Sequence, residues 1–194
     1  AGKGFMARDG VFEEVDCALT WHPADINSVA RDSSLANIQL TFRFQGTASH
    51  AALSPEHGRS ALDALELMNM GVQFLREHIV PEARVHYAIL DAGGTSPNVV
   101  QATASALYLI RAPKNHMVAD IHQRVSDIAR GAALMTGTTV EETFGKACSS
   151  IVPNLTLEKL LQENMELLGC PAYTPEEEEF AQALRATFGQ TQDS

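Results

Sequence analysis

Four side chains in the sequence are candidates for chemistry because of their types and surroundings. The first is His22, which ends an apolar stretch in Thr20-Trp21-His22-Pro23. An imidazole at the rigid end of a strand can be directed at a metal ion, although such a histidine is also commonly a hydrogen-bonded core residue. No HxxEH, CxxC or HxH pattern accompanies it, so the chain is not expected to build a metal site unaided.

The second candidate is His50, which lies in Gly46-Thr47-Ala48-Ser49-His50-Ala51-Ala52. Small residues on both sides would leave the imidazole exposed and able to approach another molecule closely. The alternative is a polar loop histidine with no role, and the local sequence leaves both interpretations open.

The other two candidates are Asn98 and Arg111. The segment Gly93-Gly94-Thr95-Ser96-Pro97-Asn98 lacks the lysine of a P-loop and the third glycine of a dinucleotide-binding loop. It is better interpreted as a turn that presents Asn98 as a hydrogen-bond donor. Arg111 ends an apolar run, and such an arginine either extends along the surface to water or binds a carboxylate through two hydrogen bonds.

Hydrophobic periodicity predicts the elements that position these residues. Apolar residues alternate in the segments predicted as strands and recur every three or four residues in those predicted as helices. In chain order the predicted elements are a strand over 37–45, a helix over 58–79, strands over 85–89 and 104–111, a helix over 114–135 and a strand over 138–144. The order β-α-β-β-α-β is that of the ferredoxin-like fold, in the α+β class.

Three zones follow from this pattern, namely 1–26, 27–148 and 149–194. The first is predicted to hold a short helix and then a buried strand over 15–23. The last is predicted to hold a helix over 155–168 that ends at Gly169, and a second helix that begins after Thr174 with proline and four glutamates.

Composition limits the class of protein. Of the 194 residues, 45% are hydrophobic and 20% charged, as in soluble globular proteins. The formal net charge of -10 argues against nucleic acid or an anionic membrane as a partner. No apolar run approaches the roughly 18 residues of a membrane span. The three cysteines are far apart and odd in number, which favours the reducing cytoplasm, and we expect Cys148 and Cys170 to be buried. The first residues, which lack an initiator methionine, suggest a piece of a longer protein.

Four segments together resemble the aminoacylase and carboxypeptidase family of metallopeptidases. They are Thr20-Trp21-His22-Pro23, the stretch from Phe44 to Ala52, Gly58-Arg59-Ser60-Ala61-Leu62-Asp63-Ala64, and Gly93-Gly94 through Asn98-Val99-Val100. The similarity extends over essentially the whole chain.

The resemblance implies a catalytic α/β domain around a two-metal site of zinc or manganese, with an inserted ferredoxin-like lid through which two copies form a homodimer. In that family pattern His22 matches a metal-binding histidine. His50 matches the lid histidine that stabilises the oxyanion in the partner's active site. Asn98 and Arg111 match residues that hold the substrate's carbonyl region and its carboxylate.

The function implied by the resemblance is hydrolysis of the amide bond of p-aminobenzoyl-glutamate or a related N-acyl amino acid. Zones 1–26 and 149–194 would then be segments of an incomplete catalytic domain, and 27–148 the lid. The other metal ligands and the general base would lie outside this sequence, so the chain alone is expected to be inactive. The alternatives are a dimerisation or binding module without catalytic activity, and a dipeptidase of the same family.

Overall fold

The computed structural model describes residues 2–24, 26–31 and 33–189 of the chain. They divide into two compact units. We call the first, Ala1–Ala18 with Asp32–Val152, the sheet unit, and the second, Leu19–Arg31 with Pro153–Ser194, the helical unit. Among the described helices, none has both the length and the apolar character that crossing a membrane requires.

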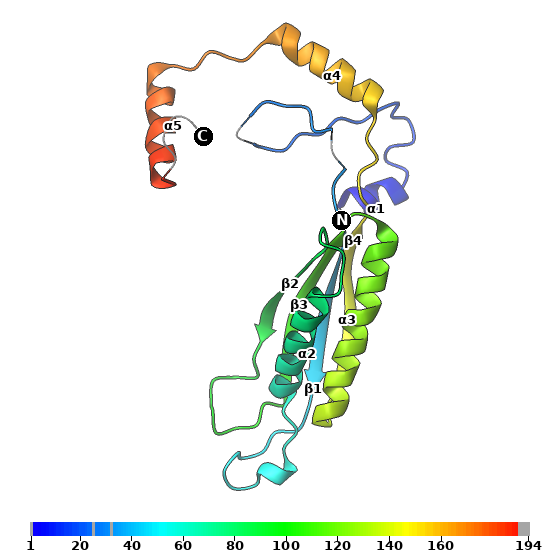
Figure 1. The fold of residues 1–194 in the computed structure, drawn as a ribbon, viewed down its shortest axis with the longest axis vertical. Coiled ribbons are helices and arrows are strands. Elements are labelled where there is room, and N and C mark those ends of the chain that lie inside the picture. Colours follow the sequence, from blue (N-terminus) through cyan, green and yellow to red (C-terminus); the bar gives the residue numbers. More distant parts are fainter. Residues whose placement is uncertain (1, 25, 32, 190–194) are drawn as a thin grey trace. The chain divides into compact units, whose positions relative to one another are not determined.

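The sheet unit is built on four antiparallel strands in the order β2-β3-β1-β4. The strands are β1 (Ala36–Gln45), β2 (Arg84–Asp91), β3 (Thr103–Ala112) and β4 (Thr139–Cys148). The two central strands, β1 and β3, pair along their whole lengths, from Ala36 opposite Ala112 to Gln45 opposite Thr103. β2 and β4 are therefore the edges of the sheet (Figure 1).

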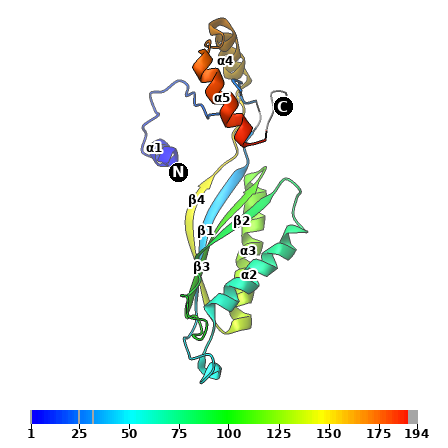
Figure 2. The ribbon, with the colours of Figure 1, turned by 90° about the vertical axis from the view of Figure 1, so that its left-hand side faces the viewer.

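Both long helices of the sheet unit cover the same face of the sheet (Figure 2). They are α2 (Ala61–Arg76) and α3 (Asn115–Thr136), which also pack on each other. Ser60 caps α2 by accepting a hydrogen bond from the Asp63 N–H at 3.0 Å. Gly137 ends α3 in the left-handed conformation at φ 67°, which glycine adopts without steric cost.

The core lies between this face and the two helices. Alternate residues of the central strands point into it and most of these are buried, whereas most residues between them are only partly buried or exposed. Its largest members are Leu40, Phe42, Phe44, Leu65, Met68, Tyr108 and Ile110. Helices on one face leave the opposite face of the sheet without a covering layer in this unit (Figure 2).

The predicted βαββαβ order and the α+β class are confirmed, and each predicted element of the sheet unit forms within a few residues of its expected bounds. Two details of the pattern were wrong. Met135, expected on the buried stripe of α3, is 68% exposed because the stripe drifts and Ala129 and Ala133 are buried instead. Cys148 and Cys170 are exposed, as is Cys17.

The predicted buried strand over 15–23 does not form. No residue there pairs with a strand in the described part of the chain, and Trp21 is 84% exposed. A strand needs a neighbour for its backbone N–H and C=O groups, and apolar composition alone cannot supply one. The short helix α1 (Gly2–Arg8), which precedes it, forms as predicted.

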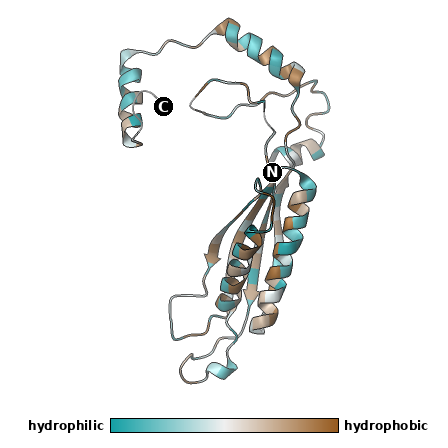
Figure 3. Ribbon diagram, in the orientation of Figure 1, coloured by the Kyte–Doolittle hydropathy of each residue, from teal (hydrophilic) through white to brown (hydrophobic). Residues whose placement is uncertain are grey.

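The helical unit contains α4 (Leu155–Leu168) and α5 (Pro175–Thr187). The Thr174 hydroxyl caps the start of α5, as the sequence predicts, and the Glu177 side chain in turn accepts from the Thr174 N–H. Neither helix has a buried residue. Both nevertheless carry exposed large apolar residues, including Leu155, Leu167 and Phe180. Hydrophobic and hydrophilic residues alternate along both helices (Figure 3).

One polar contact in the core offers a test of the packing. The Tyr108 hydroxyl donates to the side-chain oxygen of Asn69, which is 8% exposed. Burial raises the pKa of Tyr108. We expect Tyr108→Phe to lower the free energy of unfolding by about 1–2 kcal/mol, because Asn69 loses its donor while buried. Urea unfolding measures this. Adding Asn69→Leu should recover part of the loss, and no recovery would contradict the assigned contact.

Candidate functional site

Two loops meet at the end of the sheet where β1 stops and β3 begins. Residues 46–60 lead from β1 to α2, and residues 92–102 lead from β2 to β3. The Val100 N–H donates to the Ser49 carbonyl and the Ala51 N–H to the Asn98 carbonyl, both at 2.9 Å. His50 and Val99 form an isolated β-bridge between these bonds. Two segments nearly fifty residues apart in sequence are thus held side by side.

A close backbone approach closes the first loop on itself. Thr47 and Arg59 exchange two backbone hydrogen bonds, at 2.8 and 2.9 Å, which brings the Arg59 carbonyl against Gly46. A Cβ on Gly46 would lie 1.9 Å from the Arg59 oxygen, so only glycine fits there. The two ends of the loop that carries His50 are therefore held together by backbone hydrogen bonds.

The ring of His50 is oriented by the backbone that follows it. Its Nδ1 accepts from the N–H groups of Ala52 and Leu53, at 3.3 and 3.2 Å. A neutral imidazole whose Nδ1 is an acceptor carries its proton on Nε2. His50 is exposed, and Nε2 has no hydrogen bond to any described residue. The residue thus presents one N–H donor outward in a defined tautomer.

Asp91 anchors the loop that carries Asn98. Its carboxylate accepts from the Gly93 N–H at 2.9 Å and from the Thr103 hydroxyl at 3.0 Å, which joins the two ends of the loop. The Gly93 N–H, helped by the Thr103 hydroxyl, holds the pKa of Asp91 below its ordinary value. Asn98 is exposed beside His50, and together they form a polar pair at this end of the sheet.

Arg111 lies at the opposite end of the sheet. It pairs with Asn37 at the start of β1, whereas the loops with His50 and Asn98 begin beyond the pair Gln45 and Thr103. Along β3, Arg111 comes eight residues after Thr103, a span of about 27 Å in an antiparallel strand. Arg111 is exposed on the face of the sheet that the helices do not cover. The structure therefore brings two of the predicted residues together and keeps the third apart.

His22 belongs to the helical unit and is exposed. Its Nδ1 lies 2.9 Å from the Pro23 carbonyl oxygen, so the ring N–H at Nδ1 donates there and Nε2 is left with a free lone pair. Metal-binding histidines commonly make such a bond to a carbonyl. Within the described ranges, no group of three or more histidine, cysteine, aspartate or glutamate side chains could hold a metal ion. His22 could therefore bind a metal ion only together with ligands from outside the described residues.

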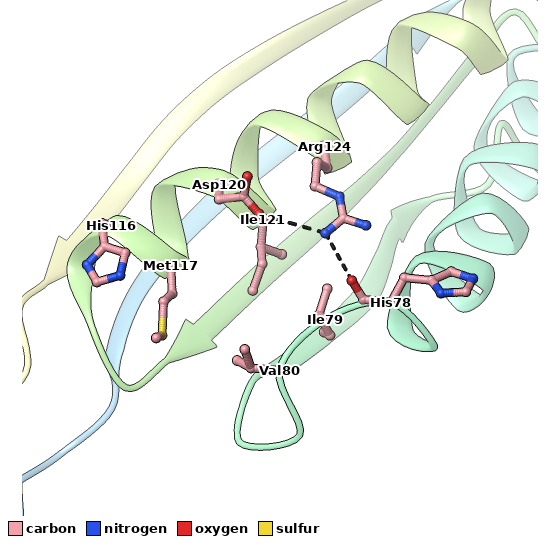
Figure 4. Close-up of a pocket in the computed structure, with 8 residues that line it drawn as sticks. All are labelled: His78, Ile79, Val80, His116, Met117, Asp120, Ile121 and Arg124. Atoms are coloured by element: carbon pink, nitrogen blue, oxygen red, sulfur yellow. Dashed lines mark hydrogen bonds and ion pairs between the residues drawn. The ribbon is translucent and has the colours of Figure 1, made fainter.

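A pocket of about 600 Å³ lies between the segment after α2 and the first turns of α3 (Figure 4). Ile79, Val80, Met117 and Ile121 supply its apolar wall. At its rim, Arg124 donates to the His78 carbonyl at 3.1 Å and pairs with Asp120 at 3.7 Å, so its charge is already engaged (Figure 4). None of the four predicted site residues lines this pocket.

Sequence reasoning missed the residues that hold the loops. The turn Asp91-Ala92-Gly93-Gly94 carried a usable signal, since an aspartate commonly accepts from the N–H two residues later. The contact of Gly46 with Arg59 had no such signal, because it joins residues whose approach depends on the whole loop.

The sheet unit matches the model of a known family, described as the peptidase dimerisation domain, over residues 34–135. The match covers more than half of the chain and all of the core of the sheet unit. The chain belongs to this family, the M20 peptidase dimerisation domain.

Three known proteins are similar to the chain. It is 56% identical over 188 residues to one of the subunits of the p-aminobenzoyl-glutamate hydrolase of Escherichia coli, covering 97% of this chain and 39% of that protein. It is 34% identical over 169 residues to the Xaa-Arg dipeptidase of Mus musculus, covering 87% of this chain and 39% of that protein. The crystal structure of an aminobenzoyl-glutamate utilization protein from Klebsiella pneumoniae superposes with a TM-score of 0.57 at 26% identity, covering 66% of this chain and 33% of that chain.

The chain thus spans about two fifths of the length of the curated relatives named above. The first two relatives are hydrolases by name, and the chain is similar to the part of each that it covers.

The Asp91 anchor leads to a pH-dependent prediction. A carboxylate whose pKa is lowered on folding stabilises the fold fully above its unfolded pKa, and the contribution is lost as the pH falls through the lower, folded pKa. We expect Asp91→Asn to reduce stability at pH 7 and to have little effect near pH 2, with the loss appearing over the acid range between. Urea unfolding across this range measures it. Glu82→Gln, an exposed turn position, is the control, and a pH-independent loss at Asp91 would contradict the role of its charge.

Proposed function

We propose that this chain comprises the dimerising lid, residues 27–148, and two segments of the catalytic domain, residues 1–26 and 149–194, of a metal-dependent amidohydrolase. The enzyme would cleave the amide bond of p-aminobenzoyl-glutamate or a related N-acyl amino acid. The observation that carries the proposal is the outward Nε2–H of His50, held in one tautomer by the Ala52 and Leu53 N–H groups and placed beside Asn98. The relatives at 56% and 34% identity, both hydrolases of amide bonds by name, support it.

The proposed role of His50 is to donate to the oxyanion that forms when the amide carbonyl is attacked. A preoriented donor at that position typically contributes about 3–4 kcal/mol of barrier lowering. A neutral imidazole suits this role because its fixed Nε2–H needs no reorganisation as charge develops on the oxygen. The Asn98 amide, at the same end of the sheet, supplies a second neutral donor for the carbonyl region of the substrate.

Arg111 is proposed to bind the carboxylate of the amino-acid part. A guanidinium matches a carboxylate because two parallel N–H groups face two oxygens. With about 27 Å of strand between Arg111 and the His50 loop, one chain cannot apply both to a small substrate. We therefore propose that each active site takes His50 and Asn98 from one copy of the protein and Arg111 from the other.

The proposed divalent metal, zinc or manganese in a two-metal site, would be held partly by His22. Its Nε2 is free because Nδ1 bonds to the Pro23 carbonyl. A bound metal would supply Lewis acidity and a water activated near neutral pH. The other ligands would come from parts of the protein outside this chain, so the chain alone is proposed to be inactive.

An apolar surface beside the edge strand supports a homodimer. Leu67, Met70 and Phe74 form an exposed stripe along α2, and Phe74 is 67% exposed. Tyr87 and Ile89 of β2 pair with the buried residues Tyr108 and Ala106, so they point to the helix side of the sheet, and they are also exposed. An edge strand with free backbone groups next to an apolar stripe is suited to a second copy, which would cover the stripe and extend the sheet.

Dipeptidase activity is the second candidate, favoured by the similarity to the Xaa-Arg dipeptidase. A substrate panel on the full-length protein separates the two, with aminobenzoyl-glutamate in one arm and dipeptides in the other. A module without catalytic activity would hydrolyse neither substrate in the presence of zinc or manganese.

A cytoplasmic location is proposed as well, since all three cysteines are free.

Mixing two variants tests the shared active site. In the full-length protein, we expect His50→Ala to lower kcat far more than it raises KM, and Arg111→Ala chiefly to raise KM. Random mixing of the two variants would place His50 and Arg111 intact in one of two sites of each hybrid dimer. At substrate concentrations well below the wild-type KM, where both single variants are slow, we expect the mixture to recover about a quarter of the wild-type activity.

The matched control is a doubly substituted protein, His50→Ala with Arg111→Ala, mixed with His50→Ala. No site in that mixture has an intact His50, so activity should stay at the level of His50→Ala alone. If the first mixture recovered no more activity than the mean of the two variants assayed separately, both residues would belong to a site within one copy of the protein.

The apolar stripe offers a separate test of the homodimer. Phe74→Glu places a charge in the proposed interface, and we expect it to shift the protein from dimer to monomer because an unpaired charge is costly to bury. Analytical ultracentrifugation measures the shift. Gln73→Glu, one residue away on the same helix, is the control and should stay dimeric. A dimeric Phe74→Glu protein would contradict this location of the interface.

A further inference from the structure

Arg111 has a second arginine directly opposite it on the neighbouring strand. The antiparallel register of β2 and β3 pairs Arg84 with Arg111. Residues paired in this way project from the same face of a sheet, with Cβ atoms about 4.5–5.5 Å apart. Both side chains are exposed on the face that α2 and α3 leave uncovered. Two guanidinium groups therefore share one small area of the sheet.

Nothing in the neighbouring rows of the sheet neutralises these charges. Across the sheet, the row continues from Arg111 to Asn37 and then to Cys148. The next row contains His86, Leu109, Gln39 and Lys146, again without a carboxylate. No ion pair of Arg84 or Arg111 occurs among the described residues. Like charges directly opposite each other on a sheet destabilise it, so this pair has a cost that packing does not explain.

Arg84 is already held in place by backbone atoms. Its Nη1 donates to the Ala83 carbonyl at 2.6 Å and also to the Pro81 carbonyl. These bonds restrict the side chain yet leave Nε and Nη2 without hydrogen bonds to described residues. A guanidinium fixed through one nitrogen, with two N–H-bearing nitrogens still free, is prepared to bind an anion.

We infer that Arg84 binds the side-chain carboxylate of an acidic substrate while Arg111 binds its main-chain carboxylate. The inference rests on the proposed function, and it deepens that function by assigning a residue to selectivity for dicarboxylates. The two carboxyl carbons of a glutamyl group are four bonds apart, roughly 5 Å when extended. That spacing is close to the separation of the two paired positions on β2 and β3. A glutamate-like ligand relieves the repulsion that the arginine pair otherwise maintains.

Steady-state kinetics of the full-length, metal-loaded protein test the inference with two substrates, p-aminobenzoyl-glutamate and p-aminobenzoyl-glutamine. They differ only in whether the side chain carries a charge. We expect Arg84→Gln to raise KM for the glutamate substrate at least about tenfold, and KM for the glutamine substrate less than about twofold. Arg84→Lys should retain an intermediate preference, because it keeps the charge without the fork. Arg111→Gln should weaken binding of both substrates.

The control variant is Arg130→Gln, which removes an exposed arginine from α3 and should change neither KM. Thermal unfolding of Arg84→Gln should occur at a temperature no lower than that of the wild type, since removal of one like charge relieves repulsion. Equal effects of Arg84→Gln on both substrates, or no effect on either, would overturn the inference.

A binding measurement separates this inference from the proposed function. If the wild-type protein hydrolyses neither substrate, the proposed function fails, and calorimetric titration with N-acetylglutamate and N-acetylglutamine then decides the role of Arg84. A preference for N-acetylglutamate that Arg84→Gln abolishes supports the inference. Absence of a preference, a preference that survives the substitution, or failure of the wild type to bind either ligand overturns it.

Discussion

The pairing of β1 with β3 is the constraint on which the arrangement of the site depends. Ten consecutive pairs run from Ala36 with Ala112 to Gln45 with Thr103, without a register shift. At one end, the pairing places the exits of two loops next to each other, which allows His50 and Asn98 to meet. At the other end it sets Arg111 beside Asn37. The pairing of β1 with β3 therefore brings His50 and Asn98 together and keeps both a strand's length away from Arg111.

The one-sided packing of this sheet explains why so much of its surface is left for other contacts. Both helices bury the same face, so the opposite face keeps polar and charged side chains such as Arg43, Arg84 and Arg111. On the helix side, the edge strand β2 extends past the cover, and Tyr87 stacks on Tyr108 at 5.4 Å while still 39% exposed. The unit thus has one core and two further surfaces of different chemistry. One carries the paired arginines Arg84 and Arg111, and the other is apolar.

Most of the fold could be predicted from the sequence because period and capping are local. Leu40, Phe42 and Phe44 alternate within one strand, and Gly137 ends a helix by its own conformation. The bounds of six elements followed from such signals. The strand predicted over 15–23 does not form because the prediction also used only local signals. A local apolar run does not indicate whether a partner strand exists.

The site was predictable only in part. The residue types of His50, Asn98 and Arg111 suggested chemistry, and resemblance suggested their roles. Their spatial relation could not be predicted locally, because it depends on which strand pairs with which and in what register. The tautomer of His50 depends likewise on N–H groups placed by the turn after it, and the pairing of Arg84 with Arg111 depends on a hairpin of 28 residues, counted from one arginine to the other.

The chain as a whole is negatively charged, whereas the end of the sheet with Arg84 and Arg111 is positively charged. Both can hold because salt screens charges that lie far apart. At physiological ionic strength, fields between exposed charges fade over about 8 Å. The net charge of -10 is spread over a chain whose acidic residues include the four glutamates at the start of α5, in the other unit. Directly opposite Arg111 on the sheet lies Arg84, and Lys146 lies two strands away in the next row. An anionic ligand at this face therefore experiences the local positive field, while the overall acidity disfavours large polyanions that would contact many sites at once.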